Sequence, residues 1–165
     1  MAIRCELPGD ADAISSVITA AFREAEHSGG NEARIVDMLR EAKALAVSLV
    51  ATQNNEVVGH VAFSPVTIDG RSDGWFGLGP VAVMPGRQRK RFGTALIEAG
   101  LATLRDRGSR GCVVLGDPAY YGRFGFAADP DLCLAGVPAE YFQRISFEGG
   151  RPVGEVEYHP AFGVR

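Results

Sequence analysis

The chain has 165 residues, of which 46% are hydrophobic and 22% are charged, and its formal net charge is −3. This length predicts one domain over residues 1–165 that buries about 70% of the surface of the unfolded chain. The composition is that of a globular protein, and the weak negative charge excludes a chain-wide basic surface for nucleic acid or anionic membranes.

The three cysteines, Cys5, Cys112 and Cys133, form no CxxC pair. Their odd number argues against a disulfide framework and against a zinc site. The first residues lack an apolar signal core, and no apolar run approaches the about 18 residues that a membrane span needs. We therefore expect a soluble, cytoplasmic protein without a metal.

The first third of the chain has the apolar spacing of one strand and two helices. The strand covers residues 2–7, and a helix over about 11–25 is expected to be capped by Asp10 or Asp12. A second helix is expected from about Glu32 to Ala44. The apolar residues expected to face the core are Ile14, Val17, Ile18, Ala21, Phe22, Ile35, Met38 and Leu39.

Three antiparallel strands are expected next. Strands at Leu45–Thr52 and Glu56–Ile68 flank an Asn54-Asn55 pair that suits a tight hairpin turn. A second turn at 69–74 leads into a third strand, which includes the apolar run at Leu78–Val83. This strand would lie beside the second one in a mostly antiparallel sheet.

A helix over about 91–107 follows the third strand, and Gly108 is a suitable stop for it. Cys112–Leu115 is a short, fully apolar strand. A strand, a helix and a strand at this spacing predict a right-handed crossover and a parallel strand pair. Asp117-Pro118 then predicts the start of a short helix over 119–123.

The rest of the chain, from residue 127 to residue 165, contains many turn residues. Strand-like patches occur near 131–135, 145–147 and 153–158. We expect irregular structure with two or three short strands there.

The most distinctive segment is a basic turn between the third strand and its helix. It contains Arg87, Arg89, Lys90 and Arg91. The first N–H groups of a helix have no partner within the helix and lie at the positive end of its dipole, so cations beside them predict a site for phosphate oxygens. A contact to nucleic acid is an alternative use of these cations.

The same segment resembles the acyl-CoA-binding motif of the GNAT superfamily of N-acyltransferases. In that motif a Gln/Arg-x-x-Gly-x-Gly/Ala turn joins a central strand to a helix. The match puts Gln88 at its first position and Gly93 at its last, and Arg91 stands where the family has its first glycine. An arginine at that position can add a phosphate contact.

A second segment, Tyr120-Tyr121-Gly122-Arg123-Phe124-Gly125-Phe126, is similar to the Phe-Tyr-x-x-x-Gly-Phe segment of the same superfamily. Tyr121 falls on the family tyrosine that is proposed to protonate the departing CoA thiolate. The resemblance covers roughly residues 1–126. Within it, the Gly-Asp-Pro-x-Tyr-Tyr segment at residues 116–121 resembles a segment of poorly characterised predicted N-acetyltransferases of the superfamily.

The resemblance implies a mixed α/β (α+β) fold in which a splayed parallel strand pair forms the CoA cleft and helices cover both sheet faces. It implies that acetyl-CoA is the co-substrate, that an amine attacks the acetyl carbonyl directly, and that amides near Val81 or Val83 stabilise the oxyanion. The implied catalytic residues are Tyr121 and Val81. The implied cofactor-binding residues are Val81, Val83, Gln88, Arg89, Lys90, Arg91, Phe92, Gly93, Thr94 and Tyr121.

The base that deprotonates the amine is left open. The family uses a glutamate on the central strand or a water held by a carboxylate, but Trp75–Val83 contains no acid. Glu32, Asp73, Glu155 and Glu157 are the candidate substitutes for this general base. His60 is expected to be a buried core histidine, and Cys112 is expected to be a buried structural thiol.

Two functions follow as hypotheses. One is an N-acetyltransferase that acts on an amine of a small molecule or peptide. The other is a non-catalytic acyl-CoA-binding or regulatory protein with the same fold. It is favoured by the missing acid on the central strand and by Arg91 in place of the family glycine. The resemblance also allows a homodimer formed through the tail strands.

Overall fold

The computed structural model describes residues 1–23, 30–88 and 91–163. A seven-stranded sheet has the strand order β1-β2-β3-β5-β6-β9-β7, and a small sheet has the order β4-β10-β8. The strands are β1 (Ala2–Cys5), β2 (Val47–Gln53), β3 (Glu56–Pro65), β4 (Thr67–Ile68), β5 (Trp75–Val83), β6 (Gly111–Leu115), β7 (Ala127–Ala128), β8 (Leu132–Leu134), β9 (Phe142–Ser146) and β10 (Gly154–Glu157). The α-helices are α1 (Ala11–Phe22), α2 (Glu32–Glu41), α3 (Phe92–Asp106) and α4 (Pro118–Tyr121).

The large sheet is mostly antiparallel, as expected. The β2–β3 hairpin turns at Asn54 and Asn55, whose φ angles of 52° and 64° are those of a turn that matches the twist of the strands. The strand expected over Glu56–Ile68 is instead two strands, because the chain leaves the large sheet after Pro65 and pairs Thr67–Ile68 with β10.

The parallel pair is β5 and β6, joined by α3 as predicted. Their registered pairing covers only three positions, from Trp75 opposite Gly111 to Gly77 opposite Val113. Beyond Gly77, β5 pairs with β3 alone, and β6 continues beside β9. The two parallel strands therefore separate within the sheet and leave a gap at its centre.

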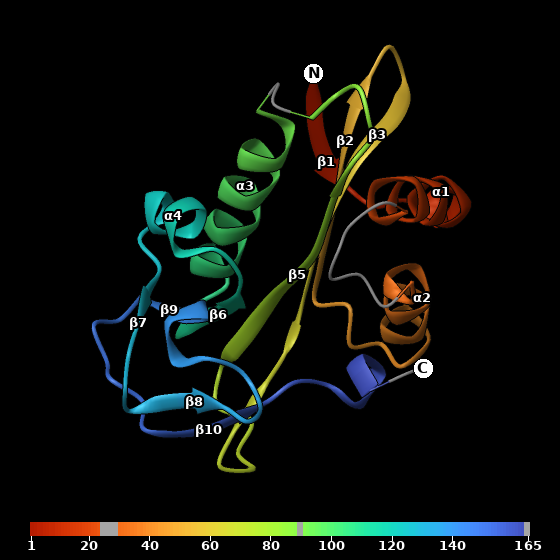
Figure 1. Cartoon of the computed structure of the whole chain (residues 1–165). Helices are drawn as coiled ribbons and strands as arrows, with labels where there is room; N and C mark the ends of the chain where they lie inside the picture. Colours follow the sequence, from red (N-terminus) through yellow and green to blue (C-terminus); the bar gives the residue numbers. More distant parts are fainter. Residues whose placement is uncertain (24–29, 89–90, 164–165) are drawn as a thin grey trace.

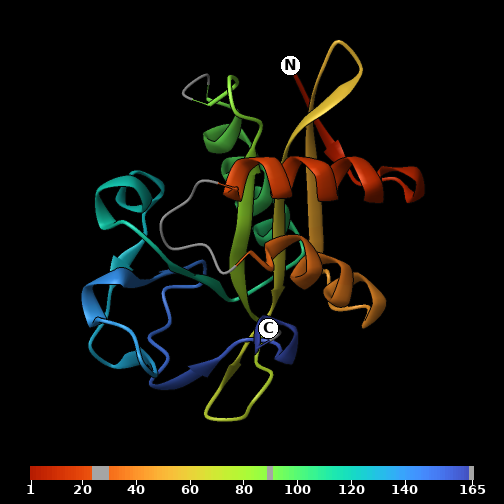
Figure 2. The ribbon, with the colours of Figure 1, turned by 45° about the vertical axis from the view of Figure 1, so that its right-hand side comes forward.

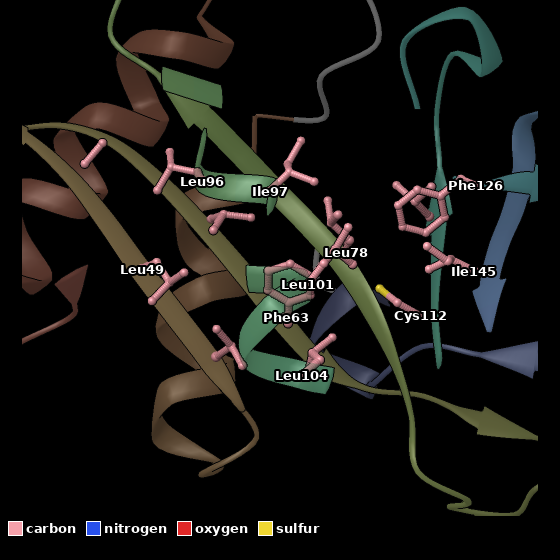
Figure 3. Packing of buried hydrophobic residues seen from close by; sticks show 14 of the residues in the cluster. Leu49, Phe63, Leu78, Leu96, Ile97, Leu101, Leu104, Cys112, Phe126 and Ile145 are labelled. Atoms are coloured by element: carbon pink, nitrogen blue, oxygen red, sulfur yellow. The ribbon is translucent and has the colours of Figure 1, made fainter. Parts of the chain in front are cut away.

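Helices cover both faces of the large sheet. Figures 1 and 2 show α3 on one face and the pair α1 and α2 on the other. Figure 3 shows the larger core cluster, in which α3 packs on the sheet; its labelled members are Leu49, Phe63, Leu78, Leu96, Ile97, Leu101, Leu104, Cys112, Phe126 and Ile145. A second cluster packs Ile14, Val17, Ile18 and Val36 against Val50, Ala62 and Ala82.

The ends of α1 and α2 differ from the prediction. α1 ends at Phe22 rather than at residue 25, and residues 24–29 lie outside the described chain. α2 ends at Glu41 instead of Ala44, because Lys43 has a left-handed backbone with φ 57°.

The expected side-chain cap of α1 is absent. Asp10 is the residue before the helix, but its carboxylate accepts from the Leu7 N–H at 2.7 Å and pairs with Arg4 at 2.7 Å. The carboxylate therefore fixes the turn that precedes α1 and makes no bond to the first turn of α1.

The tail contains more strand than predicted. β9 begins at Phe142, three residues before the expected patch, and β7 pairs with it at the edge of the large sheet. β10 pairs in parallel with β8 and antiparallel with β4, which produces the small sheet. No described helix is long and apolar enough to cross a membrane.

Gly100 allows α3 to lie close to β3. A Cβ added there would overlap the Phe63 ring. Alanine is the better helix former by about 1 kcal/mol, but overpacking a core typically costs about 1–3 kcal/mol. We therefore expect Gly100→Ala to lower the free energy of unfolding by about 1–2 kcal/mol in urea denaturation. Gly9→Ala is the control, because a Cβ at Gly9 meets nothing within 4 Å; equal stability of both variants would contradict close packing at Gly100.

Candidate active site

The N-terminus of α3 is exposed to a pocket at the end of β5. Arg91 precedes the helix with φ 65° and ψ 12°, a left-handed conformation. The Ala95 N–H donates to the Arg91 carbonyl at 3.0 Å, so the N–H groups of Phe92, Gly93 and Thr94 have no acceptor within the helix. The first turn contains no acidic side chain. The helix therefore presents three backbone donors and the positive end of its dipole to the pocket.

This pocket, called the α3 pocket below, has a volume of about 450 Å³. The predicted residues that line it are Val81, Val83, Gln88, Arg91, Phe92, Gly93 and Thr94. Arg87, Tyr120 and Arg123 complete its lining. Arg89 and Lys90 lie outside the described residues. The motif residues that the structure describes are thus brought together around one cavity.

Arg123 is a cation that the sequence reasoning missed. Its Nε donates to the Tyr120 carbonyl at 3.0 Å, and its guanidinium carbon lies 4.4 Å from the centre of the Tyr120 ring. The Tyr120 hydroxyl lies 3.4 Å from the Thr94 hydroxyl, which links α4 to α3. The spacing of Tyr120 and Arg123, three residues apart on a predicted helix, was the signal that could have found them.

The edge of β5 that faces the gap carries backbone groups that do not pair with β3. The Met84 N–H donates to the Val58 carbonyl of β3 at 2.8 Å. Because backbone groups alternate in direction along a strand, those of Val81 and Val83 point away from β3, toward the gap. The Gln88 side-chain amide donates to the Val83 carbonyl at 3.1 Å, which agrees with that direction.

A second pocket, called the gap pocket, lies where β5 and β6 separate. Its volume is about 470 Å³, and β5 borders it with Leu78, Gly79 and Pro80. The register of β3 and β5 shifts at this point, since Val61 is opposite Val81 but Phe63 is opposite Leu78. The extra residue makes a bulge, which bends β5 between the two pockets.

Tyr121 does not line the α3 pocket, but its ring centre lies 5.0 Å from that of Tyr120, which does. α4 begins at the predicted cap, where the Asp117 carboxylate accepts from the Ala119 N–H at 2.9 Å. The Tyr121 ring is 6.0 Å from the Phe126 ring, and a Cβ at Gly116 would contact it. Burial raises the pKa of Tyr121 to about 12, so its hydroxyl keeps its proton at neutral pH.

Among the predicted acids, Glu32 alone lies at the site. It occupies the first position of α2 and lines the gap pocket. Asp73 pairs with Arg110 at 3.1 Å, and Glu155 and Glu157 are exposed on β10. Cys112 is fully buried, and this burial raises the pKa of its thiol, as expected for a structural cysteine. Among the described residues, no group of three or more His, Cys, Asp or Glu could hold a metal ion.

His60 is a buried member of the core, as predicted. Its Nε2 lies 2.8 Å from the Ser48 hydroxyl, which donates to Glu6 at 2.7 Å, and Glu6 also pairs with Arg40. Because the Ser48 proton goes to Glu6, Nε2 of His60 is the protonated nitrogen that donates to Ser48. Burial lowers the pKa of His60 to about 4, against the opposing effect of Glu6.

This buried histidine predicts a pH-dependent stability. The unfolded chain takes up a proton on His60 near its ordinary pKa of about 6.5, whereas the folded chain resists protonation down to about pH 4. The free energy of unfolding should therefore fall by about 2 kcal/mol between pH 7 and pH 5. Urea denaturation of the wild type and of His60→Gln at pH 7 and at pH 5 measures this change in the free energy of unfolding. A wild-type profile as flat as that of the variant would contradict the assignment. The lowered pKa of Glu6 acts in the same direction but at lower pH.

Comparisons with known proteins agree with this geometry. The chain matches the family model described as an acetyltransferase (GNAT) domain over residues 3–128. It is 38% identical over 169 residues to the uncharacterised N-acetyltransferase YhbS of Escherichia coli K12, covering 98% of each chain. It is 36% identical over 136 residues to the uncharacterised N-acetyltransferase YjhQ of the same strain, covering 80% of this chain and 71% of YjhQ.

Two solved structures are similar along almost the whole chain. A GNAT family acetyltransferase from Brucella melitensis, crystallised in complex with acetyl-CoA, is 51% identical with a TM-score of 0.89, covering 98% of this chain and 97% of that one. Escherichia coli YhbS in complex with CoA is 36% identical with a TM-score of 0.86, covering 99% of this chain and 92% of that one. The resemblance indicated by the two motifs is thus confirmed, and this chain belongs to the GNAT family of acetyltransferases.

Proposed function

We propose that this chain is an N-acetyltransferase that binds acetyl-CoA in the α3 pocket and transfers its acetyl group to an amine at the gap. The observation that carries the proposal is the cationic pocket at the start of α3. There, free backbone N–H groups, Arg91 and Arg123 face one cavity. This combination suits a pyrophosphate. The CoA and acetyl-CoA complexes of the two similar structures support the assignment.

In this proposal the pantetheine arm of acetyl-CoA lies along the open edge of β5, against Val81 and Val83. The Val81 N–H would donate to the thioester carbonyl oxygen and stabilise the negative charge that develops on it during attack. Val81 lies one residue beyond the bulge, where β5 passes from the α3 pocket to the gap pocket. The reacting carbonyl would thus be reachable from both pockets.

The proposed reaction needs no acyl-enzyme. The amine loses a proton to Glu32 or to a water beside it, and its lone pair forms the new C–N bond. The C–S bond then breaks, and Tyr121 gives its proton to the departing CoA thiolate. The second proton that the nitrogen loses passes to solvent, from which the Tyr121 hydroxyl regains its proton. The raised pKa of Tyr121 keeps that proton available. The products are the amide and free CoA.

The test is direct binding of acetyl-CoA by calorimetry, followed by turnover with a panel of amines. Loss of thioester absorbance is the suitable readout, because the exposed Cys5 and Cys133 would consume a thiol reagent. We expect binding and amine-dependent loss of the thioester. Binding without turnover of any amine would instead favour the second candidate, a non-catalytic acyl-CoA-binding protein, which the absence of an acid from Trp75–Val83 supports.

A further inference from the structure

The gap pocket lies across the sheet from the α3 pocket. Residues of α1, α2 and the tail line the gap pocket, whereas residues of α3 and α4 line the α3 pocket. Figure 1 shows α1 and α2 on one side of the sheet and α3 and α4 on the other. Both pockets border β5, the gap pocket at the bulge and the α3 pocket beyond it. If the proposed function holds, the gap pocket is where the acceptor must sit to reach the acetyl carbon.

The lining of the gap pocket is apolar with one acid. Its large apolar members are Phe22, Ile35, Leu78, Pro80, Leu115, Leu134 and Phe162. Glu32 and Tyr158 supply the polar side chains, and among the described residues no Lys, Arg or His lines it. The Tyr158 hydroxyl is buried without a partner in the described part of the chain. Walls of this kind leave additional hydroxyl or ammonium groups of a ligand without partners, which costs free energy.

Leu115 is a large apolar residue of the gap pocket whose exposure is not explained by packing in the core. It is the last residue of β6, and it remains 44% exposed although the rest of the strand is buried. Leu115 lines the gap pocket, as do Gly79 and Pro80 of β5. A large apolar side chain kept exposed at the edge of a pocket is suited to contact a ligand rather than the core.

We infer that the acceptor is a compact monoamine with an apolar body. The inference rests on the proposed function and adds the substrate class. The apolar body contacts Leu115 and the aromatic side chains of the pocket, and Glu32 attracts the single positive charge of the amine. The volume of about 470 Å³ suits a small molecule. Polyamines and amino sugars should bind more weakly, because the described lining residues offer their additional polar groups only the side chains of Glu32 and Tyr158.

The probe is 2-phenylethylamine, compared with spermidine and glucosamine. We expect its kcat/KM to exceed those of the other two amines by at least about tenfold. Calorimetry with the CoA-saturated protein should also detect binding of 2-phenylethylamine. Leu115→Asn should raise the Kd and KM for this amine by about fivefold to tenfold and leave the Kd for CoA unchanged. Because Leu115 is exposed, this variant should fold normally.

Leu7→Asn is the matched control. Leu7 is 55% exposed and lies outside the gap pocket, so its replacement should change neither constant. Preference for spermidine or glucosamine, no binding of 2-phenylethylamine, or no effect of Leu115→Asn on that binding would overturn the inference. Leu115-dependent binding without turnover would support the amine pocket and refute the acetyltransferase proposal, so the two failures are distinguishable.

Discussion

Tyr121→Phe should lower kcat by about tenfold to a hundredfold and change the Kd for acetyl-CoA by less than about twofold. The substitution removes only the hydroxyl, and the ring keeps its contacts with Phe126 and with the backbone at Gly116. Without the phenol, the CoA thiolate must leave unprotonated or take a proton from water. The loss should therefore affect the chemical step and leave binding intact.

The neighbouring tyrosine provides a matched control. Tyr120 lines the α3 pocket and supports Arg123, whereas Tyr121 does not line it. Tyr120→Phe should therefore affect acetyl-CoA binding, through the lost contact to Thr94, more than it affects kcat. Rates of thioester loss at saturating acetyl-CoA separate the two effects. If Tyr120→Phe lowers kcat and Tyr121→Phe does not, the proton donor is Tyr120.

The pH dependence gives an independent check on Tyr121. With the pKa of its hydroxyl raised to about 12, the side chain stays protonated throughout the range in which the protein is assayed. We therefore expect no decrease of the wild-type kcat between about pH 8 and pH 10 that is caused by ionisation of Tyr121. A decrease caused by Tyr121 would be present in the wild type and absent from Tyr121→Phe. Such a fall would mean that the hydroxyl ionises near its ordinary pKa.

Arg91→Ala should weaken acetyl-CoA binding by about tenfold or more, since a hydrogen bond to a charged group is worth about 1.5–3 kcal/mol. Arg91→Gly should weaken acetyl-CoA binding by the same factor but raise the free energy of unfolding. The left-handed backbone at this position, with φ 65°, costs a side-chain-bearing residue about 1 kcal/mol that glycine avoids. The two variants separate the contribution of the cation from that of the backbone.

Calorimetry with CoA and with dephospho-CoA identifies the phosphate that Arg91 contacts. A pyrophosphate contact predicts the same loss for both ligands, because dephospho-CoA lacks only the 3′-phosphate. Arg71→Ala is the control, since Arg71 lies in the turn before β5 and lines neither pocket. If Arg91→Gly binds as tightly as the wild type, the side chain is merely solvated, and only the backbone of the turn matters.

Local residue chemistry predicted much of the fold. The Asn54-Asn55 turn, the Asp117 cap and the Gly108 helix stop depend on short-range preferences, and all three occur as expected. The spacing of apolar residues likewise predicted a helix over about 91–107, and α3 covers Phe92–Asp106. These features depend on a few neighbouring residues, so the sequence contains enough information to place them.

The same local logic failed where tertiary contacts compete. Asp10 is a good helix cap by residue type, but Arg4 and the Leu7 N–H take its carboxylate. The strand expected to run from Glu56 to Ile68 divides because its last residues pair with β10, almost ninety positions away in the chain. The β-propensity of these residues does not indicate that their pairing strand comes from the tail of the chain.

The sequence by itself determined the basic turn, the helix behind it and the tyrosine segment that together indicate a GNAT acetyltransferase. It also showed that Arg91 replaces a glycine, and the structure added that its backbone takes the left-handed conformation that glycine adopts most easily. Only the tertiary structure decided that Arg123 joins the α3 pocket and that Glu32 lies at the gap pocket. The physical reason is that the walls of both pockets come from segments that are distant in the sequence and meet only when the sheet has assembled.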